Sequence, residues 1–196
     1  MKKTISAVIF CTFFSFFSFF PLSTLFAVSY EDACNVMKAE NIISGDFIQK
    51  RTIASNGKTL KSYGVFTVSS EKIIWETTKP VKNTVTITMG KLTQTDSRGK
   101  TTQLDGTENP MFFLVTKMIS SLFSGNKEEL EQYFEVDFES NSESELWTMK
   151  LFPKDSMLSQ GIQSIILCGN TKVLNSMQTI QVTGDSILYE FLNQRQ

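Results

Sequence analysis

The sequence predicts a mainly β (α+β) domain, built as one large curved antiparallel sheet with few helices. Three observations predict this fold class. Segments that alternate apolar and polar side chains follow one another along most of the chain. Short turn signals, such as those at 56–58 and 184–185, join neighbouring segments as hairpins. Only three segments repeat their apolar residues with helical spacing.

Residues 1–27 have the layout of a secretory signal peptide. The basic residues Lys2 and Lys3 precede an apolar run, and the small residue Ala27 stands at its end. We therefore expect export, cleavage near Ala27 and one mature domain over 28–196. The alternative is an uncleaved membrane anchor, because the apolar run approaches the length that spans a bilayer.

Charge and composition exclude several classes of function. The part after the leader carries 17 basic and 20 acidic residues, a net charge of −3. Without a basic patch we expect no nucleic-acid partner, and we expect a monomer. The chain has no histidine, which excludes Ser-His-Asp and Cys-His catalysis. The acids Glu143 and Glu145 lie in a polar turn typical of a solvated loop. We therefore expect no enzyme, no cofactor and no metal site.

Two cysteines remain after the leader, Cys34 and Cys168. An oxidising compartment permits a disulfide between them. It would close a loop worth about 4–5 kcal/mol in the chain-entropy model. The alternative, two buried free thiols that pack as small apolar groups, is equally compatible with the sequence.

The expected elements begin with an amphipathic helix over 29–42. Ser29 is its N-cap, and Glu31 and Asp32 favour the first turn. Six strands are expected next, and Pro80 follows the third of them. Their ranges are 45–54, 59–68, 71–77, 83–89, 91–96 and 101–104.

A second helix is expected over 110–124, with Asn109 as its N-cap and Pro110 in its first turn. It spans about 21 Å and contains Lys117, so it does not fit a membrane span. Its apolar face consists of Met111, Leu114, Val115, Met118, Ile119 and Leu122. We interpret this face as a lid over an apolar cavity; the alternative is a helix packed permanently in the core.

A polar helix over 126–134 and five more strands complete the chain. The strands are expected at 133–140, 144–152, 162–169, 172–182 and 185–193, with a polar link between the second and the third. The total is about eleven strands, and one face of such a sheet must be covered. The residues expected to line the cavity are Phe47, Phe66, Trp75, Val85, Ile87, Trp147 and Met149.

Several motifs occur in an order that resembles a known family. Phe47 and Gln49 are followed by a Gly-Val-Phe strand at 64–66, and then by Trp75 and Pro80. A later segment repeats Trp, Leu and Pro at 147, 151 and 153, and the last hairpin also matches. In this order the motifs resemble the periplasmic outer-membrane lipoprotein carrier family, the LolA-like proteins. The resemblance covers nearly all of the chain after the leader.

The resemblance implies an unclosed eleven-strand half-barrel, with a helical lid over an apolar cavity that shields acyl chains in transit. It also implies acylated lipoproteins or other lipids as partners, with an inner-membrane transporter as donor and an outer-membrane acceptor. One departure stands at 69–72, where Ser-Ser-Glu-Lys replaces the family's Arg-Pro-Gly element. Arg51 is a candidate for the charge at the cavity mouth; the alternative is an ordinary solvated arginine.

Two functions remain open on this sequence. The first is a soluble periplasmic carrier of acylated cargo. Phe10 stands before Cys11, where lipoprotein acylation needs a small residue, so the soluble carrier is favoured over an anchored receptor of the same fold. The second is a periplasmic lipid-sensing or protein-interaction domain that shares the fold without carrying cargo.

Overall fold

The computed structural model describes residues 27–38, 42–88, 90–141 and 143–195, apart from the side chains of Pro110 and Met111. The predicted signal peptide lies outside the described residues except for Ala27. No helix in the described part of the chain is long and apolar enough to cross a membrane.

In the part of the chain that the structure describes, eleven strands form one sheet, which confirms the predicted fold class. They divide into six strands before the central helices and five after them, as the alternation predicts. Their bounds are β1 Ile43–Ile53, β2 Lys58–Val68, β3 Lys72–Lys79, β4 Asn83–Thr88, β5 Lys91–Thr95, β6 Thr101–Asp105, β7 Phe134–Asn141, β8 Leu146–Pro153, β9 Ile162–Gly169, β10 Leu174–Gln181 and β11 Ser186–Arg195.

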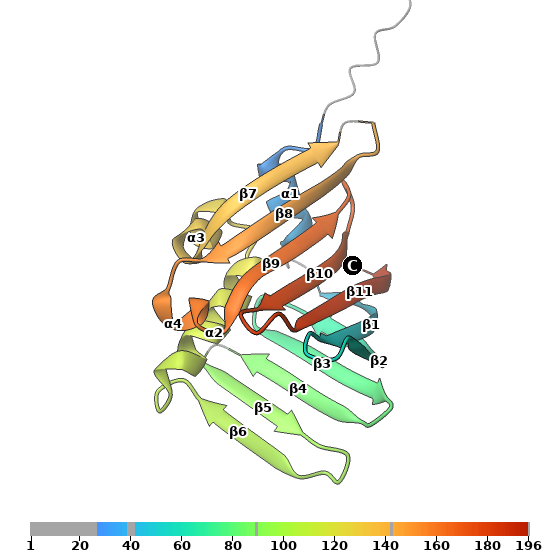
Figure 1. Ribbon diagram of the computed structural model, residues 1–196, viewed down its shortest axis with the longest axis vertical. Coiled ribbons are helices and arrows are strands. Elements are labelled where there is room, and N and C mark those ends of the chain that lie inside the picture. The colour runs from blue at the N-terminus through green and yellow to red at the C-terminus, as the bar shows by residue number, and fades with distance from the viewer. Residues whose placement is uncertain (1–26, 39–41, 89, 142, 196) are drawn as a thin grey trace, which may run out of the picture.

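The sheet is an open half-barrel (Figure 1). Its strand order is β6-β5-β4-β3-β2-β1-β11-β10-β9-β8-β7, and the paired neighbours run antiparallel. The first strand therefore pairs with the last, for example Phe47 with Phe191, and joins two meanders at the centre. The half-barrel does not close, because β6 and β7 stand at opposite ends of this order.

Among the described residues, four helices accompany the sheet: α1 Tyr30–Met37, α2 Pro110–Leu122, α3 Lys127–Tyr133 and α4 Ser156–Ser159. The predicted N-caps are correct, since Ser29 accepts from the backbone of Asp32 and Asn109 from that of Phe112. Within the described residues α1 ends at its C-cap Lys38; the prediction of helix over 39–41 lies outside them. The predicted polar link contains α4, whose N-cap Asp155 accepts from two backbone N–H groups.

The two halves of the sheet are covered differently. The inner face of β7–β9 is closely packed, with Trp147, Met149 and Leu151 at most 1% exposed. Residues from α1 and α3, such as Cys34 and Leu130, belong to the same buried cluster. In Figure 1 α2 runs between these strands and the strands β4–β6. Helix α2 therefore covers the part of the concave face that α1 and α3 do not cover.

Candidate functional site

Helix α2 is buried on most of its circumference, which explains its unusual composition. Thr116, Ser121 and Leu122 are buried on different sides of the helix. The buried hydroxyl of Thr116 donates to the carbonyl oxygen of Phe113 at 2.8 Å, and that of Ser121 donates to the carbonyl oxygen of Met118 at 2.7 Å. Buried polar groups are therefore satisfied within the helix. The outward side is narrow and includes the exposed Phe113.

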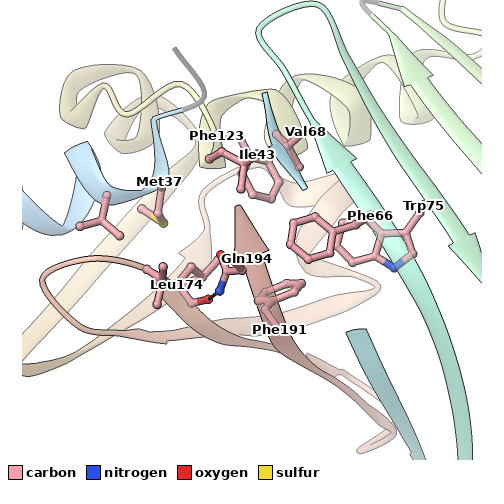
Figure 2. Close-up of a pocket in the computed structure, with 11 residues that line it drawn as sticks. Met37, Ile43, Phe66, Val68, Trp75, Phe123, Leu174, Phe191 and Gln194 are labelled. Carbon is pink, nitrogen blue, oxygen red and sulfur yellow. Dashed lines mark hydrogen bonds between the residues drawn. The ribbon is translucent and has the colours of Figure 1, made fainter. Parts of the chain in front are cut away.

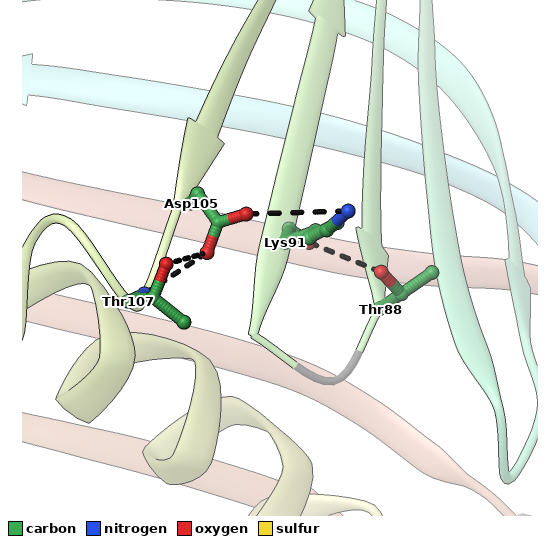
Figure 3. A network of polar contacts seen from close by, with 4 residues as sticks. All are labelled: Thr88, Lys91, Asp105 and Thr107. Carbon is green, nitrogen blue, oxygen red and sulfur yellow. Dashed lines mark hydrogen bonds and ion pairs between the residues drawn. The ribbon is translucent and has the colours of Figure 1, made fainter.

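A polar network holds the segment that leads into α2 (Figure 3). The Asp105 carboxylate accepts hydrogen bonds from the backbone N–H of Thr107 at 2.9 Å and from its hydroxyl at 2.8 Å. Lys91 lies 4.0 Å from the same carboxylate, and the hydroxyl of Thr88 donates to the backbone of Lys91. The two hydrogen bonds from Thr107 hold the pKa of Asp105 below its ordinary value. This network ties the segment before α2 to β4 and β5.

An apolar cavity of about 430 Å³ lies between α2 and the concave face. A volume of this size is typical of small-molecule sites, which cover roughly 300–1,000 Å³. Side chains from both meanders and from α2 form its wall. They are Gln49, Ile73, Trp75, Thr77, Asn83, Val85, Ile87, Met118, Ile119, Leu122, Phe123, Ile162, Ile165, Met177, Thr179, Ile187 and Tyr189.

An aromatic cluster forms the floor of this cavity. The Trp75 ring lies 5.4 Å from that of Phe47 and 5.1 Å from that of Tyr189, measured between ring centroids. Burial raises the pKa of the Tyr189 hydroxyl, so this group stays neutral. The Trp75 indole nitrogen is buried without a hydrogen-bond partner among the described residues. The floor is therefore aromatic and uncharged.

Three of the predicted cavity residues line the cavity: Trp75, Val85 and Ile87. Two others lie beneath it. Phe47 is 1% exposed and packs under Trp75, while Phe66 lines a small apolar space of about 20 Å³ beside α1. Figure 2 shows this space, with Phe66 and Trp75 beside one another.

The remaining two predicted cavity residues lie in the closely packed half of the sheet. Trp147 and Met149 do not line the 430 Å³ cavity. The indole N–H of Trp147 donates to the carbonyl oxygen of Asn170 at 3.0 Å, which fixes the ring in the core. A role of these two residues in lipid binding stays a prediction.

The predicted lid face divides into two groups. Met118, Ile119 and Leu122 line the cavity. Leu114 and Val115 are half-buried and pack against the main core cluster, as Ile119 does, but they do not line the cavity. The side chain of Met111 lies outside the described residues.

Arg51 lies near the rim of the concave face. Its side chain lies on the same face of β1 as those of Phe47 and Gln49, because these residues are two apart in the strand. The side chain is 50% exposed. Its guanidinium lies 3.9 Å from the Asp185 carboxylate in the last hairpin, but it does not line the cavity. A role as the charge at the cavity mouth stays a prediction.

The possible disulfide is not formed, because the sheet separates the two cysteines. Cys34 is a free thiol, 1% exposed, among core residues on the concave side. Cys168 is also free; it alternates with the buried Leu167 and lies 3.7 Å from the Thr148 hydroxyl, on the opposite face. In this structure both thiols are free, but only Cys34 is buried and Cys168 is half-buried.

Sequence reasoning missed the half of the cavity wall that comes from the C-terminal strands. Met177, Ile187 and Tyr189 are its main apolar residues. The alternation in 172–193 predicts strands there, and a matching set of inward residues could have been read from it. The pairing of β1 with β11, which places those residues beside Trp75, has no local signal in the sequence.

The fold and the cavity together define a half-barrel protein of the LolA type. The profile of the family described as "Outer membrane lipoprotein carrier protein LolA" matches residues 39–196. The chain therefore belongs to the LolA family. No curated protein matches it significantly.

Several solved structures are similar to this chain at low sequence identity. A LolA superfamily protein from Nitrosomonas europaea is 10% identical, with a TM-score of 0.44 over 84% of this chain and 90% of the other. A DUF1329 family protein from Desulfovibrio piger is 11% identical, with a TM-score of 0.45 over 84% and 90%. A putative outer membrane lipoprotein-sorting protein domain from Vibrio parahaemolyticus is 10% identical, with a TM-score of 0.44 over 83% and 88%.

Proposed function

We propose that this protein is a soluble periplasmic carrier that shields the acyl chains of lipoproteins or other lipids during transfer toward the outer membrane. It acts by binding and release and catalyses no reaction. A donor in the inner membrane and an acceptor at the outer membrane are the partners that such a route requires.

The observation that supports this proposal is the 430 Å³ cavity between α2 and the concave face. Its wall is mostly aliphatic and aromatic, and its few polar residues, such as Gln49, Thr77 and Asn83, are uncharged. A charged ligand would have no counter-charge inside it, whereas an acyl chain needs none.

The energetics of chain burial fit a carrier. Each methylene removed from water contributes about 0.8 kcal/mol. About twelve buried methylenes therefore supply roughly 10 kcal/mol before the costs of ordering the chain are subtracted. The lowest of these costs, about 4 kcal/mol, leaves at most about 6 kcal/mol for one chain, an affinity of roughly tens of micromolar, which permits both capture and release.

Trp75 provides a direct test, because the chain has only two tryptophans. In a Trp147→Phe variant the fluorescence comes from Trp75 in the cavity floor. Titration with oleic acid or a synthetic diacylated lipopeptide is expected to shift this emission saturably. In the matched Trp75→Phe variant the signal comes from Trp147, which is bonded to Asn170 in the packed core, and it should stay constant.

A lipid analysis of protein purified without detergent identifies the cargo. Mass spectrometry of the organic extract is expected to show acyl lipid in a stoichiometric amount. If the extract contains no acyl lipid and the Trp75 emission shows no saturable response, the carrier proposal is wrong.

A further inference from the structure

A second hollow, of about 560 Å³, opens beside the end of α2. We call it the vestibule. Its wall comes from the β2–β3 turn, the end of β4, the C-terminal end of α2 and the first turn of α3. The lining residues are Lys38, Ser69, Ser70, Glu71, Lys72, Ile73, Ile87, Thr88, Ser120, Phe123, Ser124 and Glu129.

The vestibule adjoins the apolar cavity. Ile73, Ile87 and Phe123 line both hollows, so these three side chains form the boundary between them. Phe123 is the C-cap of α2 and also lines the small apolar space of Figure 2. A ligand that enters the cavity at this boundary leaves its polar end in the vestibule.

The chemistry of the vestibule differs from that of the cavity. It carries the carboxylates of Glu71 and Glu129 and the ammonium groups of Lys38 and Lys72, together with hydroxyl groups such as that of the exposed Ser70. Within this lining, carboxylates can accept hydrogen bonds from an amine and an ammonium group can donate to a phosphate or carbonyl oxygen. Both signs of charge are therefore available within one hollow.

We propose that the vestibule binds the polar head of the same amphiphile whose chains fill the cavity, and that it selects heads with a primary amine close to the acyl esters. This inference rests on the carrier function proposed above. An aminophospholipid and a diacylated lipopeptide with a free terminal amine share this chemistry. Glu71 and Glu129 bind the amine, and Lys72 binds the neighbouring phosphate or carbonyl oxygen.

The cavity and the vestibule contribute differently to binding, for a physical reason. Burial of methylenes depends on chain length and distinguishes poorly between lipids with equal chains. A charge-assisted hydrogen bond in the vestibule depends only on the head group. The cavity therefore determines affinity, and the vestibule determines which amphiphile is preferred.

The test compares ligands that differ only at the amine. Displacement of a dansylated fatty acid is measured with dioleoylphosphatidylethanolamine and with a diacylated lipopeptide, each in its free and its N-acetylated form. Oleic acid, which has no amine, reports on the cavity alone. The variant is Glu71→Gln with Glu129→Gln, and the control is Glu139→Gln with Glu143→Gln, two exposed positions of β7 and the turn that follows it.

For at least one of the two ligand types, acetylation is expected to weaken binding to the native protein about tenfold. The Glu71 and Glu129 variant should lose this preference and keep its affinity for oleic acid, while the control pair should behave as the native protein does. The ligand that shows the effect identifies the source of the amine. If oleic acid binds but acetylation has no effect for either ligand, the head-group inference is overturned and the carrier function stands. If oleic acid fails to displace the probe, both are overturned.

Discussion

The ring of Phe47 occupies the space into which a side chain on Gly64 would project. The two residues are direct partners in the pairing of β1 with β2. A Cβ built on Gly64 would lie 2.5 Å from Cζ of Phe47 and would also overlap the carbonyl oxygen of Glu76. Packing therefore explains the glycine of the Gly-Val-Phe motif at 64–66, because only a residue without a side chain at position 64 leaves room for the Phe47 ring against the sheet.

Gly64→Ala is expected to destabilise the protein by about 1–3 kcal/mol. The added methyl group must displace a fully buried ring or the backbone of β3, and overpacking of this kind costs about that much. Urea unfolding followed by circular dichroism measures the change. Gly161→Ala is the control: its added Cβ would lie 3.9 Å from the carbonyl oxygen of Leu158, an ordinary contact, so it should change stability by less than about 0.5 kcal/mol. Equal effects of the two substitutions would refute this packing argument.

Ile119→Glu is expected to weaken the binding of oleic acid at least tenfold, with a smaller loss of stability than Leu114→Glu, because Ile119 packs against the core cluster but also faces the cavity. Ile119 lines the cavity and is half-buried, so a carboxylate there places charge against the acyl chain. Displacement of a dansylated fatty acid measures affinity, and thermal unfolding measures the fold. Lys117→Glu, on the same helix but outside the cavity lining, should bind as the native protein does.

Leu114→Glu tests whether the part of α2 outside the cavity lining contributes to stability rather than to binding. Leu114 packs against the core cluster and does not line the cavity. We therefore expect a loss of stability of about 2 kcal/mol or more, as for other unpaired charges placed against a core. Thermal and urea unfolding measure it. A Leu114→Glu protein with native stability and lost binding would show that α2 acts as a single lid face.

Most of the fold could be predicted from the sequence because its signals are local. Alternation marks the strands, and the turn glycines Gly57 and Gly184 adopt the positive φ angles that tight hairpins need. Helix α4 was missed because four residues are too few to show helical periodicity. Its only local signal is the N-cap Asp155.

The candidate site could be predicted only in part, because its composition depends on pairing over long distances. One hairpin, β3–β4, supplies three of the cavity residues, Trp75, Val85 and Ile87, so they can be predicted locally. Tyr189 lies beside them only because β1 pairs with β11. The inward faces of β3 and β8 look alike in sequence. Only the positions of the helices decide that Trp147 is covered while Trp75 faces a cavity.

The Asp105 network predicts a loss of stability in acid. Because the folded-state pKa of Asp105 lies below its ordinary value of 3.8, its contribution is present above about pH 4 and is lost as the pH falls through the folded pKa. NMR titration of this carboxyl should give a pKa below 3.8, and Thr107→Val should raise it, since one of the two hydrogen bonds is removed. An unchanged titration in Thr107→Val would show that the hydroxyl contributes nothing.

Cys34 is expected to resist both alkylation and oxidation. Burial raises the pKa of its thiol to about 11, so at pH 8 only about one molecule in a thousand carries the reactive thiolate. In a variant with Cys11→Ser and Cys168→Ser, iodoacetamide should label the folded protein at least a hundredfold more slowly than the urea-unfolded protein.

With Cys168 restored, oxidation should still leave the gel mobility and the melting temperature unchanged, because the sheet lies between the two sulfur atoms. A faster-migrating species that disappears on reduction would contradict this arrangement. It would require Cys34 and Cys168 to reach the same face, and therefore a packing of α1 different from the one in which Cys34 is buried on the concave side.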